Sequence, residues 1–414
     1  MSAAGADPAL AALLTPEAVR ERCNELWQLA ERDALDHFEL HAPALEQASA
    51  HVLDELARNY PGRPVPYHSR WRHFELGGRD LWHELAPPGN GMTVHERARA
   101  RFDLAIVSVL LDAGAGAEWR YRDAATGITL GRSEGLALAS LRLFASGRLS
   151  AAAAREPLRC DASCLAALRP ELLADAMQSA PGNPLAALAG RCALLRRLGE
   201  AALACPGVFG RGGATRPGHL YDHLRAAAVD GRLPARTILI ALLTWLGGIW
   251  PGGRQLGAWR AGDVGVHPAL RRADASDTLV PFHKLSQWLA YSLVEPLQEA
   301  GIEITEPDAL TGLAEYRNGG LLIDAGVLRL RDAAARERAH DPGATLVVEW
   351  RALTVAALDR IAVRVRAQSG HDAASLPLAA VLQGGTWSAG RRLAAQRRAG
   401  GAPPLRIASD GTLF

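Results

Sequence analysis

The sequence predicts a mainly α-helical protein, a multi-helix globular body with one or two small β-hairpins. Its 414 residues are enough to bury a large core. Hydrophobic residues make up 49% of the chain and charged residues 22%, which is typical of a folded globular protein. Apolar residues recur at helical spacing in segments of about 10 to 20 residues, and the short connections between them do not favour a parallel sheet.

The first half of the chain carries recognisable helix starts. Thr15 and Pro16 supply an N-cap and a first-turn proline, and apolar residues follow at helical spacing. The other elements predicted here are a helix over 93–111, a small hairpin over 118–130 and a helix that begins at Ser133 and Glu134 and runs to Phe144.

A Gly/Pro-rich segment over 206–218 interrupts the helical pattern and marks a lobe boundary. We therefore predict an N-terminal helical lobe with the small hairpin (1–205) and a C-terminal helical lobe with most of the site (206–414), packed as one compact unit. The helices predicted in the second lobe cover 219–228, 234–246, 282–300, 306–317, 349–368 and 376–397. Gly319 and Gly320 are expected to end the helix over 306–317.

Composition excludes several classes of protein. The net charge is only +2, so binding to nucleic acid through phosphate neutralisation is not expected. The N-terminus lacks the basic start and apolar region of a secretory signal, and the longest apolar run, 238–250, is too short to cross a bilayer. The five cysteines form no C-x-x-C pair, which favours reduced thiols. We expect a cytoplasmic protein with neither nucleic-acid nor membrane partners.

Motifs for metals and cofactors are weak. His219 and His223 have the i, i+4 spacing of two zinc ligands, but the glutamate of H-E-x-x-H is absent and such pairs are common on exposed helices. The glycine-rich segment 210–215 lacks the G-K-[S/T] ending of a phosphate-binding loop. We predict no bound metal and no cofactor.

Lys284 is the most unusual residue of the sequence. It is the only lysine among the 46 basic residues, and the others are all arginines. A lysine ammonium is compact and shifts its pKa readily when buried, which a guanidinium does not, although chance survival of one lysine codon is an alternative. Gln287 and Tyr291 follow Lys284 at helical spacing, so we expect the three side chains to share one helix face that lines a polar cavity.

A second group of polar residues precedes two glycines. Glu315, Tyr316, Arg317 and Asn318 stand directly before Gly319. A carboxylate, a phenol and a guanidinium beside residues that allow close approach are suited to a ligand-binding wall. The same composition also fits a surface ion pair with an aromatic neighbour.

Three further places contribute candidates. Glu349 and Arg351 interrupt an apolar run, where charges are costly unless they are paired or used. Trp387 lies between small residues, as a stacking platform requires. Asp263 and Asp112 are additional carboxylates whose roles the pattern leaves open.

Six segments resemble one family. They are HFELGGRDLW (73–82), GRSEGLALASL (131–141), PFHKLSQWL (281–289), LTGLAEYRNGGLLID (310–324), VEWRALTV (348–355) and GGTWSAGR (384–391). On these segments the chain is identified as a member of the uracil-catabolism family, the fourth member of the URC pathway of fungi and bacteria, formerly a domain of unknown function.

The order of these polar residues is also similar, more distantly, to the queuosine-salvage nucleotide N-glycosylases, which cleave the bond between ribose 5-phosphate and a base. This resemblance implies a helical core like that of DNA glycosylases. It implies that Lys284 holds a phosphate or assists at the sugar. Tyr316 and Arg317 would shape the ribose or phosphate site, with support from Glu349 and Arg351. The chain departs from that family in having Glu315 for an aspartate and Ser388 for a late carboxylate.

The two resemblances together imply a metal-independent N-ribosyl hydrolase that releases urea from ribosylurea or its 5′-phosphate. Glu315 is the first candidate for the catalytic carboxylate and Asp263 the second. The resemblance also implies a functional link to an enzyme similar to GTP cyclohydrolase II, which opens the pyrimidine ring. Two alternatives remain open: an amidohydrolase acting on a ureido or pyrimidine intermediate, and a non-catalytic partner of the ring-opening enzyme.

Overall fold

The computed structural model describes residues 7–250, 255–256, 259–260 and 262–408, and its architecture is mainly α-helical, as predicted. The helices of the first half are α1 (Pro8–Ala12), α2 (Pro16–Glu31), α3 (Leu45–Asn59), α4 (Leu81–Leu85), α5 (Val94–Leu110), α6 (Arg132–Ala145), α7 (Ala162–Ala166), α8 (Pro170–Ala176) and α9 (Leu188–Ala204). Those of the second half are α10 (Pro206–Phe209), α11 (Leu220–Ala227), α12 (Ala235–Leu246), α13 (Lys284–Glu299), α14 (Tyr316–Asp324), α15 (Thr345–Ser369), α16 (Leu378–Val381) and α17 (Trp387–Arg397).

Strands are short and pair two by two. The antiparallel pairs are β1 (Phe38–Leu40) with β14 (Leu328–Leu330), β2 (Glu75–Leu76) with β3 (Arg79–Asp80), β4 (Tyr121–Arg122) with β5 (Thr129–Leu130), β6 (Gly210–Arg211) with β7 (Ala214–Thr215), β9 (Gln255–Leu256) with β10 (Trp259–Arg260) and β11 (Val264–Val266) with β12 (Leu279–Pro281). Two pairs are parallel: β8 (Arg232–Pro234) with β13 (Glu303–Thr305), and β15 (Ala339–His340) with β16 (Arg406–Ile407). The β4–β5 hairpin lies where the sequence predicts one, but the described residues form more pairs than the one or two expected, and two of these pairs are parallel.

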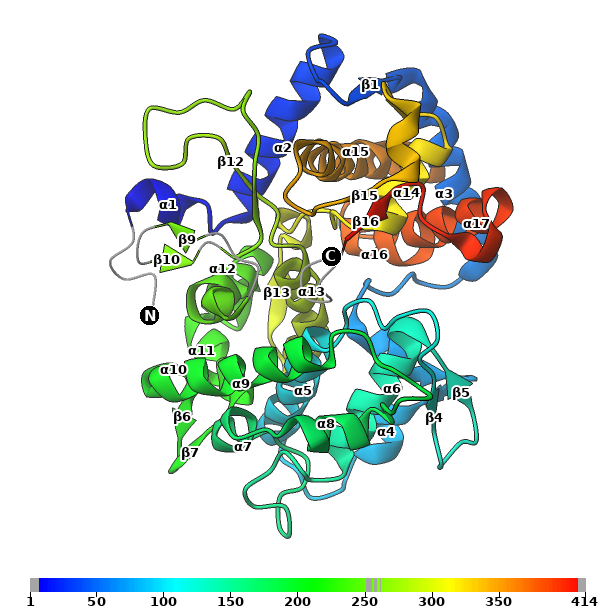
Figure 1. Ribbon diagram of the computed structural model, residues 1–414. Helices are drawn as coiled ribbons and strands as arrows, with labels where there is room; N and C mark the ends of the chain where they lie inside the picture. Colours follow the sequence, from blue (N-terminus) through cyan, green and yellow to red (C-terminus); the bar gives the residue numbers. More distant parts are fainter. Residues whose placement is uncertain (1–6, 251–254, 257–258, 261, 409–414) are drawn as a thin grey trace.

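Helix α13 lies near the centre of the molecule (Figure 1). It packs against α5 and α12, while α15 packs against α2, α3 and α14. Because its sides meet different neighbours, α13 is buried along most of its length, including Gln287, Ser292 and Tyr291. The start of α13 is therefore held on several sides, which suits it to position a functional group.

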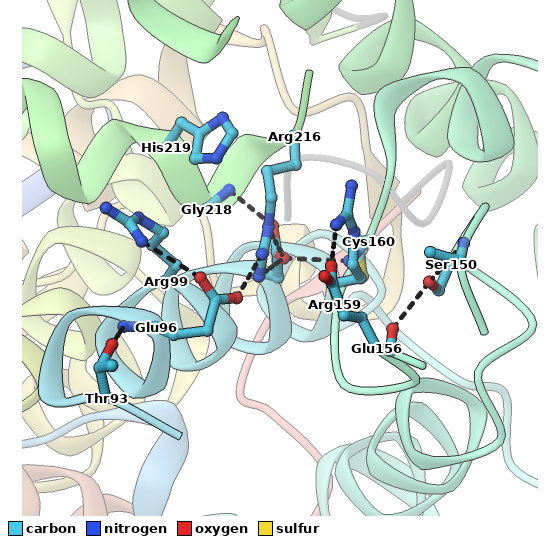
Figure 2. A network of polar contacts seen from close by, with 12 residues as sticks. Thr93, Glu96, Arg99, Ser150, Glu156, Arg159, Cys160, Arg216, Gly218 and His219 are labelled. Carbon is cyan, nitrogen blue, oxygen red and sulfur yellow. Dashed lines mark hydrogen bonds and ion pairs between the residues drawn. The ribbon is translucent and has the colours of Figure 1, made fainter. Parts of the chain in front are cut away.

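A buried ion-pair network ties the two halves of the chain together (Figure 2). Asp103 of α5 is fully buried and accepts hydrogen bonds from Arg216 Nε at 2.7 Å and from the backbone N–H of Gly218 at 2.6 Å. Arg216 also donates to Glu96 at 2.5 Å, and the backbone N–H of Cys160 donates to Asp103 at 3.0 Å. A buried carboxylate with this many donors is compensated for its loss of hydration, so the network fixes the segment before α11 onto α5.

The structure corrects the predicted helix over 306–317 and its end at two glycines. A 3₁₀ turn, η5 (Pro307–Ala309), and a non-helical segment occupy most of that range, and α14 begins at Tyr316 with Glu315 as its N-cap. Gly319 lies inside the new helix. A Cβ at this position would come within 2.7 Å of the Trp350 ring, so only glycine fits there. Close packing against α15, rather than helix termination, therefore explains this glycine.

Two smaller differences concern helix boundaries. Helix α6 begins at Arg132 with Gly131 in the N-cap position, rather than with Ser133 as cap. The segment predicted as one helix over 376–397 contains a π-helical turn, η7 (Leu382–Thr386), between α16 and α17. Such turns occur frequently at functional sites, and Trp387 follows this one directly.

Candidate active site

The helix starts α6, α13 and α14 meet around a cavity of about 430 Å³. Its other walls come from the loop 113–117 and from the chain segment 401–407 that includes β16. Six of the candidate residues line this cavity: Asp112, Lys284, Glu315, Tyr316, Arg317 and Trp387. A single cavity thus receives the only lysine of the sequence, two carboxylates, two aromatic rings and a guanidinium.

Lys284 occupies the first position of α13, and its backbone is held firmly. His283, directly before it, has a left-handed backbone conformation with φ 49°, which is uncommon for a non-glycine residue. The Lys284 N–H donates to Asp263 Oδ2 at 3.0 Å, and the N–H groups of Phe282 and His283 donate to the Asp263 carbonyl. Asp263 therefore fixes the turn from which the lysine side chain enters the cavity.

Asp263 does not line the cavity. Its two carboxylate oxygens accept from Arg351 Nη1 at 2.8 Å and Nη2 at 2.7 Å, a bidentate pair that is almost fully buried. Burial alone would raise the pKa of Asp263, but the Arg351 charge and the hydrogen bonds outweigh it, so that the pKa is lowered. This geometry gives Asp263 and Arg351 a positioning role behind Lys284.

Burial and neighbouring charge change the titration of Lys284. Burial lowers the pKa of its ammonium, and the positive charge of Arg351 lowers it further. The carboxylates of Glu315, Asp263 and Asp112 act in the opposite direction. Burial and Arg351 thus act against the charged form of Lys284 while three carboxylates favour it, a setting in which lysine and arginine differ.

Glu315 combines two functions. As the N-cap of α14 it accepts from the N–H of Arg317 at 2.8 Å through Oε2 and from the N–H of Asn318 at 2.6 Å through Oε1. Burial raises the pKa of this carboxyl, although the two hydrogen bonds and the charge of Lys284 partly offset the effect. Each oxygen uses one lone pair in the cap, so acceptor capacity remains on the cavity side.

Two guanidinium groups border the cavity at the C-terminal segment. Arg317 donates to the Gly401 carbonyl at 2.8 Å and Arg132 to the Gly400 carbonyl at 3.4 Å, so the two side chains approach consecutive residues. The Arg317 Nε is buried without a hydrogen-bond partner within the described ranges. The Arg317 guanidinium also lies 4.9 Å from the centroid of the Tyr316 ring. This edge of the cavity is suited to an anionic or polyhydroxyl group.

Gln287 and Tyr291 lie on another face of α13 and do not line the cavity. Gln287 accepts from the N–H of Thr311 at 3.3 Å, and the Tyr291 hydroxyl donates to the Thr311 carbonyl at 2.8 Å. These bonds satisfy the backbone of the non-helical segment before α14. The expected Lys–Gln–Tyr stripe is thus replaced by Lys284, Leu285 and Trp288 as the residues of α13 that face the cavity.

Asn318 and Glu349 are also buried away from the cavity. Asn318 donates to the Leu313 carbonyl at 3.2 Å and accepts from the Thr386 hydroxyl at 2.9 Å, which joins α14 to the π turn. Glu349 accepts from the N–H of His37 at 3.1 Å and lies 3.2 Å from His267 Nε2. Both residues stabilise the elements around the site, since each satisfies buried polar groups.

Sequence reasoning missed an aromatic part of the cavity wall, formed by His68, His73 and Trp288 together with Trp387. His73 lies in the segment 73–82 on which the family resemblance rests, but its composition carries no site signal of its own. Trp288 stands one helical turn after Lys284, a spacing that could have indicated a shared face.

Asp112 and Ser133 form a further wall. The Ser133 hydroxyl lies 2.8 Å from both carboxylate oxygens of Asp112, and Arg70 Nη1 lies 3.2 Å from one of them. These contacts hold the loop after α5 against the start of α6, and Asp112 is a second carboxylate in the cavity wall.

The two histidines considered as zinc ligands make other contacts. His219 is buried and its Nδ1 lies 2.7 Å from the Phe209 carbonyl, while the His223 ring packs edge-on to Trp245 at 5.8 Å. Among the described residues, no group of three or more His, Cys, Asp and Glu side chains is arranged to hold a metal ion.

All five cysteines are free thiols. Within the described segments, the helices are too short or too polar for a membrane span.

Comparison with known proteins supports the family resemblance over nearly the whole chain. Residues 12–414 match a family described as "Protein of unknown function (DUF1688)". The chain is 34% identical over 416 residues to "Protein urg3" of Schizosaccharomyces pombe, covering 98% of this chain and 99% of that protein. It is 33% identical over 430 residues to "Uracil catabolism protein 4" of Lachancea kluyveri, covering 96% and 97%. The chain therefore belongs to the DUF1688 family, and the name of one of these two relatives refers to uracil catabolism.

Proposed function

We propose that the protein acts in uracil catabolism as an N-ribosyl hydrolase that releases urea from ribosylurea or its 5′-phosphate. The observation that supports the proposal is the shared cavity of Lys284 and Glu315, a basic and an acidic side chain that are both partly buried. The name of the Lachancea kluyveri relative supports the pathway. We further propose that the substrate comes from an enzyme that opens the pyrimidine ring.

The proposed reaction consumes one water. The bond between C1′ of the ribose and the urea nitrogen breaks, and its electron pair stays with that nitrogen, which gains a proton. Positive charge develops on C1′ and the ring oxygen. Water then adds to C1′ and gives up a proton, so the products are ribose, or its phosphate, and urea.

Glu315 is suited to both charge stabilisation and proton removal. A carboxylate beside C1′ stabilises the developing sugar cation, most effectively where water is excluded. Burial raises the pKa of Glu315 towards neutral pH, which makes the carboxylate a better proton acceptor than an exposed one. Its anchored cap geometry holds it in place without reorganisation during the reaction.

The cations of the cavity have a separate task. Lys284 and the guanidinium of Arg317 are available for the 5′-phosphate or the sugar hydroxyls, since both residues line the cavity. Tyr316 is adjacent to Arg317 and half-exposed, as a residue that contacts the sugar would be. None of these roles requires a covalent intermediate or a metal ion.

The test is incubation of the purified full-length protein with ribosylurea and, separately, with its 5′-phosphate, followed by assays for urea and reducing sugar. Equal amounts of both products are expected from at least one compound, with the rate unchanged by a chelator. Absence of release from either compound, with or without added divalent metal ions, would contradict the proposal. Release of urea and sugar that needs a metal ion would keep the cleavage of the C1′–N bond but contradict the metal-independent mechanism.

A further inference from the structure

We propose that the aromatic box, formed by the rings of His68, His73, Trp288 and Trp387, binds the uncharged ureido group of the substrate through the Trp288 indole N–H. This inference rests on the proposed function, because it assigns the part of the cavity that takes the leaving group. All four residues line the cavity beside Lys284 and Glu315.

The rings of the box are packed closely. The His68 centroid lies 6.1 Å from Trp288 and 6.3 Å from Trp387, with interplanar angles of 32° and 39°. His73 stands perpendicular to Trp288, with an angle of 88° and centroids 5.8 Å apart. At these distances the rings contact one another, so together they form one aromatic wall of the cavity on which a small planar group can stack.

The box holds hydrogen-bonding atoms that the protein leaves unused. Trp288 is only 6% exposed, and its Nε1 has no hydrogen-bond partner among the described residues. The Nδ1 of His73 is likewise buried with no partner in the described part of the chain. A buried polar atom without a partner is energetically unfavourable, so a ligand that hydrogen-bonds to it is favoured.

The box contains both a donor and an acceptor. The indole N–H of Trp288 can only donate. His68 Nδ1 lies 2.8 Å from Gln383 Oε1, which can only accept, so the proton of a neutral His68 is on Nδ1 and its Nε2 is an acceptor. A ureido group offers the complementary pair, a carbonyl oxygen and N–H donors.

The rings of the box carry no charge near neutral pH, and the nearest guanidinium groups disfavour a cationic ligand. Burial lowers the pKa of His68, and burial together with the charge of Arg70 lowers the pKa of His73 to about 3, so both rings are neutral near pH 7. Arg70 lies 5.5 Å from the Trp288 ring and Arg391 lies 5.4 Å from the Trp387 ring, which disfavours a cationic ligand. An anion would gain no charged partner from the four rings.

The position of Trp288 links binding to catalysis. Lys284 and Trp288 are separated by one turn on the same face of α13, so a ligand in the box extends towards the sugar site. When the C1′–N bond breaks, negative charge spreads from nitrogen to the ureido oxygen. A hydrogen bond from the indole N–H to that oxygen is stronger in the transition state than in the bound substrate.

The binding test uses the full-length protein with ¹⁵N-labelled tryptophan indoles, titrated with N-methylurea, an unreactive compound that carries the ureido group without the sugar. The Trp288 signal, assigned by its loss in Trp288→Phe, is expected to move progressively and saturate. Trp82 is the matched control, since its Nε1 is also buried without a partner among the described residues but lies outside the cavity. Methylammonium and acetate at the same concentration should leave the Trp288 signal in place.

The kinetic test compares Trp288→Phe, which removes the N–H and keeps an aromatic ring, with Trp82→Phe. We expect kcat/KM for ribosylurea to fall about fivefold to tenfold in the first variant, as for the loss of one hydrogen bond, and to stay unchanged in the second. Hydrolysis of ribosylurea with no movement of the Trp288 signal would overturn the box assignment and leave the proposed function standing. Movement of the signal without hydrolysis would support the box and overturn the proposed function.

Discussion

At the scale of single residues, Glu315 joins a structural role to a chemical one. The carboxylate caps α14 through two backbone N–H groups and faces the cavity that contains Lys284. An amide in its place keeps one acceptor for the cap, but its NH2 group faces the N–H that the second oxygen accepts, and it can neither take a proton nor carry negative charge. The substitution Glu315→Gln therefore removes the charge and the base while it keeps one of the two cap bonds.

We expect Glu315→Gln to lower kcat by about 10²- to 10⁴-fold, the usual contribution of a general base, with a change in KM of less than about threefold. Asp80→Asn is the control for loss of a cap carboxylate outside the cavity; Asp80 accepts the N–H groups of Trp82 and His83 through Oδ1 alone, so the amide can keep both bonds. Steady-state kinetics on both compounds measure the effect. A large rise in KM with little loss of kcat would reduce Glu315 to a binding residue.

Lys284→Arg keeps the positive charge but replaces a compact ammonium by a larger planar group. If Lys284 contacts the phosphate, KM for the 5′-phosphate should rise about tenfold, whereas KM for unphosphorylated ribosylurea should change little. Comparison of the two compounds with one variant controls for general damage to the site. An unchanged KM for the phosphorylated compound would exclude phosphate contact by Lys284.

Prediction of site residues from sequence was limited by the choice of helix face. Helical spacing groups Lys284 equally well with Gln287 and Tyr291 or with Trp288, and only the tertiary neighbours decide between them. Gln287 and Tyr291 form hydrogen bonds with the backbone of Thr311, whereas Trp288 lines the cavity. The unpartnered indole N–H that makes Trp288 informative is a property of packing and has no sequence signature.

At the scale of elements, the start of α13 depends on the buried pair of Asp263 and Arg351. Asp263 holds the turn over 282–284 through its carbonyl and its carboxylate, and Arg351 of α15 neutralises it. The pair thus fixes α13 relative to α15 at the point where Lys284 enters the cavity.

Asp263→Asn should destabilise the protein by about 3–5 kcal/mol at pH 7, because it leaves a buried guanidinium without its counter-charge. Asp359→Asn is the control, since Asp359 pairs with Arg20 at 2.9 Å in a partly exposed position, where an ion pair contributes about 1 kcal/mol or less. Denaturant unfolding of the two variants checks the difference.

The pH dependence of this stabilisation has a definite sign. The pKa of Asp263 is lower in the folded protein than its ordinary value of 3.8, so its contribution is present above that value and disappears as pH falls through the folded pKa. The stability gap between the wild type and Asp263→Asn should be constant near neutral pH and narrow only below about pH 4. A gap that narrows between pH 7 and pH 5 would contradict this assignment.

Elements were predictable where local chemistry marks them. Thr15 and Thr93 cap α2 and α5 with their side chains, as their positions before apolar helical patterns indicate. The predicted helix over 306–317 was wrong because the spacing of apolar residues in this segment resembles that of a helix. In the structure Glu315 caps the next helix, and Gly319 is required by the nearby Trp350 ring. A glycine needed for tertiary packing cannot be distinguished from a helix terminator by sequence alone.

At the scale of the whole molecule, burial of the site couples activity to pH. Burial raises the pKa of Glu315 above its ordinary value of 4.5 and lowers that of Lys284 below 10.5. In the proposed mechanism Glu315 acts as a carboxylate, so the acid limb of the activity profile should have its midpoint above pH 4.5. Lys284 acts as a cation in that mechanism, so the alkaline limb should have its midpoint below pH 10.5.

The expected profile of kcat/KM is therefore bell-shaped and narrower than the two ordinary values allow. In Lys284→Arg the alkaline limb should move to higher pH, because arginine stays protonated, while the acid limb stays in place. A profile in which Lys284→Arg leaves the alkaline limb unmoved would show that another group titrates there.

The general class of the fold was predictable because composition and helical periodicity act along the whole chain. The cavity was not, because it forms where residues near 70, 112, 133, 284, 315 and 401 meet, and no local pattern relates these segments. Several of them lie within the segments that carry the family resemblance, which indicates the site without giving its geometry.

The most direct test of the account follows the carbon atom of the ureido group. Ribosylurea labelled with ¹³C at that carbon is incubated with the full-length protein and the products are observed by NMR. Cleavage of the C1′–N bond predicts that all released label is found in intact urea, in equal amount to free ribose. Label found in bicarbonate or carbamate, with the ribose still bound to nitrogen, would contradict glycosidic cleavage and identify attack on the ureido carbon instead.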